Sequence, residues 1–573
     1  MSEAPTGYFA LVLHTHLPYH LGHSTWPHGT DTLYEAAAAC YIPTLEVLER
    51  LAAEGKPAAL TIGITPIVAE QLADPRFAPG FVAYLDMKCR YAQENAAGFR
   101  EHGEGHLEHL AQRWYEHFSR LKQRFVSDYG SDLPAAFRRL AEQGRLEIAT
   151  SCATHGYLPM LSTEASIRTQ IGLGVESCER RFGVRPRGIW LPECAYRPAG
   201  AWHVPEGIDG TGIPPDPGRK GVEYYVAEAG LEWFIVDTHL LEGAPAAIPV
   251  YVDRVRRKPR IFRMDMEPRP EGKSPYRPYF VAGETPDAQG VAAFVRDPNT
   301  GLQVWSSEHG YPGDGWYLEF HKKHWPGGHK YWRITGPDCD LADKWQYEPD
   351  QVRDRLTSQA DHFVALLRET LGKQTGLTAP PVLCAPFDTE LFGHWWFEGP
   401  EFLYEVFSRL NGDSTVRPIT LSAYLDLHPP TQAVALPEGS WGAGGGHWIW
   451  WNDWVNWIWN RVYNAEHDMQ SLAQAYAQRD DPRLQQMLAQ LVRTLLLLQS
   501  SDWQFLITTD SARDYAGDRA HGHTYDFERL AAITRRYADT GEVSGDDQAF
   551  VDYLYERDTA FPTVTAERFA AGG

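Results

Sequence analysis

Short apolar runs alternate with longer segments of helical periodicity along the first two-thirds of the chain. The runs are continuous rather than alternating, which is typical of strands covered on both faces. They predict strands at residues 9–13, 59–64, 146–149, 188–191, 233–236, 302–305 and 382–385. Because strands and helices follow one another in turn, the pattern favours a parallel α/β sheet or a barrel close to eight-stranded.

Helices are expected between these strands, at residues 33–51, 167–181 and 353–371. Three regions depart from the alternation: a polar, helix-prone stretch from residue 87, a Pro- and Gly-rich stretch from residue 242, and the chain beyond residue 402. In the last of these, Leu484, Met487, Leu488 and Leu491 recur at helical spacing behind an Asp-Pro start. We therefore divide the chain into a barrel (1–86 and 141–401), a helical insertion (87–140) and an α-helical C-terminal domain (402–573).

Charge and cysteine usage narrow the function classes. Lys and Arg number 53 against 75 Asp and Glu, so the net charge is −22. This charge does not favour binding to nucleic acid or to an anionic membrane surface. The seven Cys are scattered without a CxxC pair, which argues against a disulfide framework or zinc knuckle and favours a reducing compartment. We see no signal-peptide pattern and no long apolar run in the sequence, so the expected location is the cytoplasm.

The aromatic residues put carbohydrate among the candidate ligands, since the chain holds 20 Trp, 28 Tyr and 24 Phe. Seven Trp fall within residues 441–459, after a Gly-rich turn. We expect Trp454, Trp457 and Trp459 to belong to a buried core. Trp441 and Trp450 flank the glycines and are better placed to present a face to a sugar ring.

Polar residues follow most of the predicted strands, at the end where active sites of β/α barrels are assembled. They include His14 and His16 after the first strand, His155 after the third, Glu193 after the fourth and Asp388 after the seventh. The two His of the first strand point the same way. They suit a metal pair, a pair of donors to sugar hydroxyls, or a hydrogen-bonded rim, and the sequence alone leaves these three open.

Glu193 and Asp388 each follow an apolar strand and stand among aromatic residues. Apolar surroundings raise the pKa of a carboxyl group, while polar contacts keep it ionised. Two carboxyls in different environments are what cleavage of a glycosidic bond requires. The plainer interpretation is that each carboxylate caps a helix or pairs with an Arg.

Five segments together resemble glycoside hydrolase family 57. They are His-Thr-His-Leu-Pro-Tyr at 14–19, Thr-His-Gly-Tyr at 154–157, Trp-Leu-Pro-Glu at 190–193, the stretch from Phe387 to Trp396, and Ser-Asp-Trp at 501–503. Within the family, residues 303–306 and 436–442 make the chain most similar to the bacterial 1,4-α-glucan branching enzymes. The resemblance covers nearly the whole chain.

This resemblance implies an α/β fold, an incomplete (β/α)7 barrel with a helical insertion and an α-helical C-terminal domain that contributes to a glucan groove. It implies a retaining mechanism on α-1,4-glucan, with Glu193 as nucleophile and Asp388 as acid/base, and formation of α-1,6 branches. No metal or organic cofactor is implied, and a monomer is favoured. The implied sugar-binding residues are His14, His16, His155 and Asp502, with Trp26, Trp305, Trp441 and Trp450 shaping the groove.

Branching members of the family close the site with a Tyr on a mobile loop. Tyr251 is the candidate here, with Tyr276 and Tyr279 as alternatives. Three other functions compete with branching. The first is a 4-α-glucanotransferase or α-amylase on the same fold, the second a metal-dependent deacetylase or mannosidase-like barrel using His14, His16 and an Asp, and the third a glucan-binding protein without catalysis.

Overall fold

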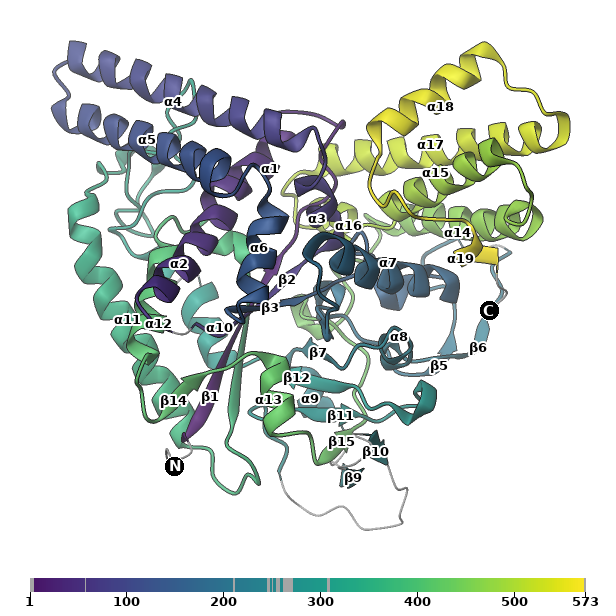
Figure 1. Cartoon of the computed structure of the whole chain (residues 1–573), viewed down its shortest axis with the longest axis horizontal. Coiled ribbons are helices and arrows are strands. Elements are labelled where there is room, and N and C mark those ends of the chain that lie inside the picture. The colour runs from purple at the N-terminus through teal and green to yellow at the C-terminus, as the bar shows by residue number, and fades with distance from the viewer. Residues whose placement is uncertain are drawn as a thin grey trace.

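Seven parallel strands form the centre of the molecule (Figure 1). The computed structural model describes residues 5–570 apart from 57, 210–211, 245–247, 250, 254–257, 261–271 and 307–309. The seven strands are β1 (Gly7–Thr15), β2 (Leu60–Ile64), β3 (Leu146–Ala149), β4 (Gly188–Ile189), β7 (Trp233–Val236), β12 (Ala292–Val295) and β13 (Val382–Asp388).

These strands form a ring from two hydrogen-bonded arcs. One arc runs β13-β1-β2-β3 and the other β4-β7-β12, with parallel pairing throughout. Single parallel bridges, Thr150 to Ile189 and Arg296 to Cys384, join the arcs at both ends. The ring is therefore a seven-stranded β/α barrel in which a single bridge joins the two arcs at each of their ends. This agrees with the expected fold class.

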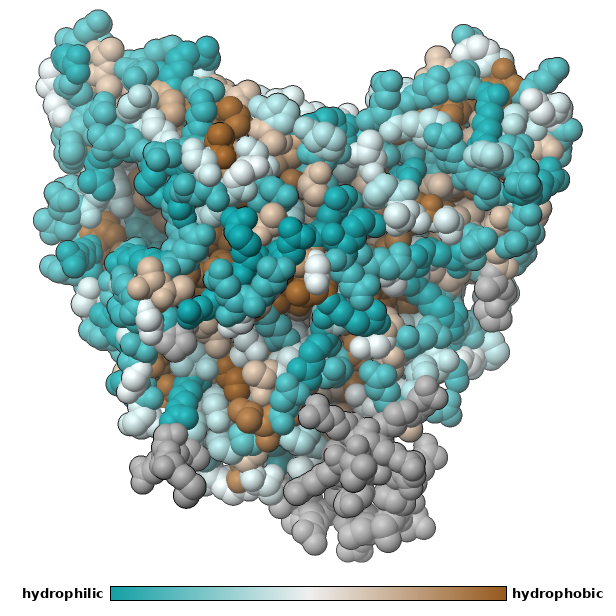
Figure 2. Space-filling model, in the orientation of Figure 1, coloured by the Kyte–Doolittle hydropathy of each residue, from teal (hydrophilic) through white to brown (hydrophobic). Residues whose placement is uncertain are grey.

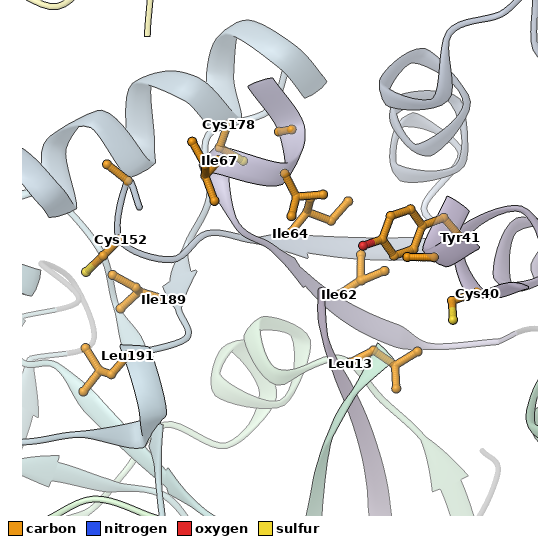
Figure 3. Packing of buried hydrophobic residues seen from close by; sticks show 14 of the residues in the cluster. Leu13, Cys40, Tyr41, Ile62, Ile64, Ile67, Cys152, Cys178, Ile189 and Leu191 are labelled. Atoms are coloured by element: carbon orange, nitrogen blue, oxygen red, sulfur yellow. The ribbon is translucent and has the colours of Figure 1, made fainter. Parts of the chain in front are cut away.

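Alternation along each strand separates the barrel interior from its outer face, because successive side chains of a strand point to opposite sides. In β1, Ala10 and Val12 pack inside with Ile235 and Phe294. The intervening Phe9, Leu11 and Leu13 pack outward against the helices. Figure 3 shows this outer layer, where Leu13 and Ile62 from neighbouring strands lie beneath Tyr41.

Six of the seven predicted strands are confirmed, and the prediction at 302–305 is wrong. Those residues end α10 (Pro298–Trp305), which begins where the Asp297 side chain accepts a hydrogen bond from Thr300 N. A four-residue apolar run does not distinguish a strand from a helix, and the Asp-Pro start was the overriding signal. The true sixth barrel strand is β12, which lies inside the stretch interpreted as a long loop.

The predicted helices at 33–51, 167–181 and 353–371 are confirmed. The first is continuous from α1 (Thr30–Ala36) through the π-helix η1 (Ala37–Tyr41) into α2 (Ile42–Ala53), and the others are α7 (Glu164–Phe182) and α11 (Pro349–Gly372). The helical insertion starts before residue 87, because α4 (Phe77–Glu101) is one unbroken helix that packs against α5 (Gly105–Gln123). A shorter helix, α6 (Leu133–Glu142), leads back to β3.

The sheet continues beyond residue 402, where the sequence predicted helices alone. After α12 (Gly399–Leu410), β14 (Val416–Pro418) pairs with β1, and after α13 (Leu421–Leu427), β15 (Gln432–Val434) pairs with β11 (Tyr279–Val281). Strands of three residues are too short to leave a periodic signal. Leu421 and Tyr424 of α13 pack into the interior cluster and close the end of the barrel away from the carboxyl ends of its strands.

The C-terminal part is a helical bundle of α14 (Asn456–Tyr476), α15 (Pro482–Leu498), α16 (Asp502–Thr508), α17 (Arg513–Thr540) and α18 (Gly545–Arg557). The Asp481 side chain caps α15 by accepting from Arg483 N and Leu484 N, as the Asp-Pro start predicted. In Figures 1 and 2 the insertion helices and this bundle project to opposite sides and leave a broad notch between them. Within the described ranges, no helix is long and apolar enough to cross a bilayer.

Candidate active site

A cavity of about 590 Å³ lies at the carboxyl ends of β1 and β13. Among its lining residues are nine of those singled out in the sequence, namely His14, His16, His155, Glu193, Trp305, Asp388, Trp441, Trp450 and, from α16, Asp502. Glu193 and Asp388, far apart in the chain, thus meet in one cleft. The C-terminal helices complete its wall, so the barrel alone does not build the site.

Glu193 sits on a strained turn. It lies in the short helix η4 (Pro192–Cys194) that follows β4, with φ 60° and ψ 23°, and Cys194 also has a positive φ of 49°. Residues other than glycine pay a free-energy cost in this region, and such strain concentrates at functional sites. The backbone N–H of Trp441 donates to the carbonyl oxygen of Glu193 at 3.1 Å and holds the turn in place.

The Glu193 carboxylate accepts two hydrogen bonds. Trp441 Nε1 donates to Oε2 at 2.8 Å, and Ser501 Oγ donates to Oε1 at 3.3 Å. Burial raises the pKa of Glu193 to about 7, the Trp441 hydrogen bond opposes this rise, and the charge of Asp388 adds to it. None of the described Arg or Lys side chains forms an ion pair with Glu193, so the carboxylate faces the cavity.

Asp388 ends β13 and lies opposite His14 of β1 in the strand register. It precedes the short helix η8 (Thr389–Leu391) but makes no side-chain cap hydrogen bond. Burial raises the pKa of Asp388 to about 6, and the positive charges of His16 and Arg296 oppose that rise. No ion pair ties Asp388 to another of the described residues, which leaves its carboxyl group to the cavity as well.

The two carboxyl groups interact through their charges, and titrate as a pair. Glu193 has the higher pKa of the two, so a proton held by the pair resides preferentially on Glu193. A carboxylate and a carboxylic acid side by side are the two species that glycosidic cleavage uses. For Glu193 to act as the nucleophile, that proton must reside on Asp388 once a substrate is bound.

His14 and His155 form a neutral imidazole pair beside Glu193. Their Nε2 atoms are 3.0 Å apart, the His14 ring stacks on Trp190 at 4.5 Å, and His155 Nδ1 lies 2.9 Å from Ser501 Oγ. Burial lowers the pKa of both rings well below the usual value. His155, like Glu193 and Cys194, has a positive φ, here 60°. Neutral rings of this kind can donate to or accept from sugar hydroxyls.

His16 and Asp502 form the charged pair of the cavity. His16 Nε2 lies 2.9 Å from Asp502 Oδ2, and its Nδ1 lies 3.2 Å from Thr65 Oγ1. Burial lowers the pKa of His16, but the Asp502 carboxylate outweighs burial and the net pKa is raised. Burial likewise raises the pKa of Asp502, and the His16 charge reverses that into a lowered pKa. This pair links the barrel to α16 of the C-terminal bundle.

The Trp side chains differ in part from the sequence prediction in which of them are buried and which are exposed. Trp305 and Trp441 line the cavity and are partly exposed. Trp450 also lines the cavity, although it is only 1% exposed and its ring stacks on Tyr157 at 4.7 Å. The core placement of Trp454 is wrong, since it is 53% exposed, whereas Trp459 is fully buried as predicted.

One predicted residue falls outside the cavity wall, and the side chain of another is not described. Trp26 is 63% exposed and packs edge-on against Trp325. Tyr251 lies in β9 (Tyr251–Asp253), and its side chain is outside the described part of the chain. Of its alternatives, Tyr276 is buried and donates to Asp297 Oδ1 at 2.9 Å, and Tyr279 is fully buried in β11. Neither alternative is placed to close the cavity.

The sequence prediction assigned no role to two charged residues of the site. Glu390 lines the cavity and accepts from Tyr41 OH at 2.9 Å, and burial together with the Asp388 charge raises its pKa to about 8. Arg296 follows β12, pairs with Asp237 at 3.2 Å and lowers the pKa of Asp388. The place of Glu390 after the seventh predicted strand pointed to the site, but Arg296 gave no such signal because β12 itself was missed.

The sequence left open whether His14 and His16 form a metal pair. Among them, no three His, Cys, Asp or Glu side chains are grouped so as to hold a metal ion. The imidazoles instead bind one another, a carboxylate and hydroxyl groups.

Two family sequence models match the chain. Glycosyl hydrolase family 57 matches residues 10–437 and the C-terminal domain of 1,4-alpha-glucan branching enzyme matches residues 461–569. A curated 1,4-alpha-glucan branching enzyme from Thermococcus kodakarensis is 39% identical over 97% of this chain and 78% of that protein.

Solved structures agree in fold. A GH57-type branching enzyme from Pyrococcus horikoshii superposes with a TM-score of 0.87 at 36% identity, covering 99% of this chain and 97% of that one. The alpha-amylase AmyC from Thermotoga maritima superposes with a TM-score of 0.80 at 28% identity, covering 99% of both chains.

Proposed function

Because the chain belongs to glycosyl hydrolase family 57, we propose that it is a 1,4-α-glucan branching enzyme that cleaves α-1,4 bonds and forms α-1,6 branches in glycogen-type glucans. The observation that carries this proposal is the match of residues 461–569 to the branching-enzyme C-terminal domain, since these residues supply Asp502 to the same cavity as Glu193 and Asp388.

In the proposed first step, Glu193 attacks the anomeric carbon of an α-1,4 bond. Asp388 protonates the departing 4-oxygen, the old bond breaks, and a covalent glycosyl-enzyme forms. The hydrogen bonds from Trp441 and Ser501 hold the Glu193 carboxylate while it attacks. The neutral His14 and His155 rings and the His16–Asp502 pair are the groups available to position the sugar hydroxyls.

In the second step Asp388, now ionised, takes the proton from the C6 hydroxyl of an acceptor chain. The C6 oxygen attacks the anomeric carbon, the bond to Glu193 breaks, and an α-1,6 linkage of retained configuration results. Water in place of the acceptor would give hydrolysis, so exclusion of water from the cavity decides between transfer and hydrolysis.

The second candidate is an α-amylase-type hydrolase or a 4-α-glucanotransferase on the same cavity. The likeness to the Thermotoga maritima alpha-amylase favours it specifically, since the two structures agree over nearly their whole length. The two functions share Glu193 and Asp388 and differ in the nucleophile of the second step.

Incubation with amylose separates the two functions. Branching raises the number of α-1,6 linkages, counted by NMR, with few new reducing ends. New reducing ends without α-1,6 linkages would reject branching, and redistributed linear oligomers would indicate a 4-α-glucanotransferase. The Glu193→Gln variant should abolish all products, while Glu176→Gln, a change of an exposed α7 residue, should leave them unchanged.

A further inference from the structure

A second and larger cavity, of about 800 Å³, lies between the helical insertion and the barrel. Its walls come from α4 and α5 of the insertion, from α2, from α12 and from the turn at residues 326–330. Figure 1 shows these helices together on the side of the molecule away from the C-terminal bundle. None of the residues assigned above to glucan chemistry lines it. Its size falls within the range of small-molecule sites.

Two buried polar side chains in this wall lack hydrogen-bond partners. His329 is 2% exposed, and neither of its ring nitrogens has a partner. Glu398 is 5% exposed; its Oε1 accepts from Tyr347 OH and Leu318 N, but its Oε2 has no partner. Buried polar atoms are nearly always satisfied in native proteins, so two such groups around one cavity indicate a polar ligand.

A tight turn brings His329 to this wall. Gly327 and Gly328 have φ of +94° and +66°, a region open to glycine. A Cβ on Gly327 would stand 2.5 Å from Tyr91 and 2.9 Å from His329 Nδ1. The turn also accepts a hydrogen bond from Lys88 Nζ to the Gly327 carbonyl at 2.7 Å.

The cations around the cavity form ion pairs at one end but not at the other. At the α2 end the cations are paired, as Arg124 is with Glu49 and Arg50 with Glu401 at 3.0 Å. At the other end, neither Lys88 nor Arg113 forms an ion pair with any described residue. Burial lowers the pKa of Lys88 to about 8, an effect that the Glu35 charge opposes and two neighbouring Lys reinforce. An anion placed there would relieve this repulsion.

Lys323 and Lys330 are those two neighbours. Both lie near one carboxylate, Glu35, at 3.9 and 3.7 Å. Glu35 Oε1 also lies 3.4 Å from His394 Nδ1. One carboxylate shared in this way does not neutralise the three Lys side chains.

Aromatic faces form the remaining wall. The Trp114 ring lies 5.2 Å from Phe397 and 6.1 Å from His329, and its Nε1 donates to the Lys330 carbonyl at 2.7 Å. Aromatic surface beside a few fixed polar groups is how proteins hold sugar rings, whose C–H faces are apolar and whose rims carry hydroxyls.

We propose that this cavity is a second ligand site that binds a phosphorylated sugar. Lys88 and Arg113 face the phosphate, His329 and Glu398 Oε2 hydrogen-bond the sugar hydroxyls, and Trp114 with Phe397 lies against the ring. The phosphate group neutralises Lys88 and Arg113. The sugar hydroxyls provide hydrogen-bond partners for the His329 nitrogens and for Glu398 Oε2. The proposal does not depend on the activity assigned to the other cavity.

Calorimetric titration of the full-length Glu193→Gln variant with glucose 6-phosphate tests the proposal, since this background does not consume glucans. We expect one molecule bound per chain with a dissociation constant below about 1 mM. Saturating maltoheptaose should leave that constant unchanged, because it occupies the other cavity. Inorganic phosphate and glucose, each alone, should bind at least tenfold more weakly.

Two substitutions locate the binding. Lys88→Gln keeps a donor for the Gly327 carbonyl but removes the charge, and should weaken glucose 6-phosphate about tenfold or more. The matched control, Arg90→Gln, removes an exposed charge from the same helix and should change nothing. His329→Phe should weaken the ester more than inorganic phosphate. Absence of binding, competition by maltoheptaose, equal affinity for glucose, or indifference to Lys88→Gln would each overturn the proposal.

Discussion

The indole Nε1–H of Trp441 donates a 2.8 Å hydrogen bond to Oε2 of Glu193, and the backbone N–H of the same Trp donates to the Glu193 carbonyl oxygen. One residue of a glycine-rich loop therefore holds both the side chain and the strained backbone of the proposed nucleophile. This loop follows the barrel in sequence, and it is anchored in turn by His239 Nε2, 3.1 Å from the Gly445 carbonyl oxygen.

Trp441→Phe should move the acidic limb of the pH profile upward. Burial raises the pKa of Glu193 to about 7 and the Trp441 hydrogen bond opposes the rise. Loss of the donor should raise that pKa further, so that Glu193 becomes the ionised nucleophile only at higher pH. A hydrogen bond to a charged group is worth about 1.5–3 kcal/mol, which corresponds to a shift of about 1 pH unit or more.

The measurement is kcat/KM for branching of amylose between pH 5 and 9. Trp448→Phe is the matched control, since Trp448 is 51% exposed and should not alter the acidic limb. An unchanged limb in Trp441→Phe would show that the hydrogen bond does not tune Glu193.

Asp388→Asn should slow branching of amylose by about 10²–10⁴-fold, the usual contribution of a general acid–base group. Formation of the glycosyl-enzyme from an α-maltosyl fluoride should fall far less, because fluoride leaves without a proton. In the pH profile of this first step, the acidic limb should move to lower pH. The Asp388 charge raises the pKa of Glu193, and the Asn side chain removes that charge.

Fluoride release measured over a range of pH follows that step directly. We expect the melting temperature of Asp388→Asn to stay within a few degrees of the wild type, because Asp388 has no ion pair among the described residues. Equal losses on amylose and on the fluoride would contradict the acid/base role.

The barrel was predictable because its strands are buried on both faces, so that β1, β2 and β13 appear as largely apolar runs. β12 was missed because its Ala-Ala-Phe-Val run lies in a stretch dominated by Pro and Gly. Residues 302–305 were interpreted as a strand because periodicity cannot assign so short a run. Tertiary pairing, which the sequence does not display, decided the case of β12, whereas the Asp297-Pro298 start decided that of α10.

The candidate site was predictable where its residues directly follow a recognised strand, as His14, Glu193 and Asp388 do. Of the partners that come from elsewhere, Trp441 and Asp502 were predicted but Ser501 and Arg296 were not. Ser501 reaches Glu193 from the C-terminal bundle, and Arg296 follows the missed strand. Trp454 was expected in the core but is exposed, because a run rich in Trp has no period from which its buried face can be read.

Glu390→Gln should stabilise the protein in a pH-dependent manner. The pKa of Glu390 in the folded chain is about 8 against an ordinary 4.5, chiefly because of burial. Between these values the folded chain holds a proton that the unfolded chain has released, so this residue's contribution is fully present below about pH 4.5 and is lost as the pH rises to 8. The free energy of unfolding lost in this way between pH 4.5 and 8 is on the order of several kcal/mol. A Gln side chain does not ionise, so the variant does not lose it.

The melting temperature of Glu390→Gln minus that of the wild type should therefore grow from pH 5 to pH 8. Glu369→Gln, a change of an exposed residue paired with Lys373, is the control and should show no such trend. A difference that stays constant with pH would mean that Glu390 is already ionised in the folded protein.

Tyr251→Ala should raise the ratio of hydrolysis to branching, because we propose that Tyr251 helps to exclude water from the glycosyl-enzyme. Tyr276 is the informative comparison: it is buried and its hydroxyl group donates to Asp297, the residue that caps α10. Tyr276→Phe should leave the ratio unchanged. Reducing ends and α-1,6 linkages formed from amylose in the same reaction give the ratio for each variant. If Tyr276→Phe raises it and Tyr251→Ala does not, the closing residue has been assigned to the wrong Tyr.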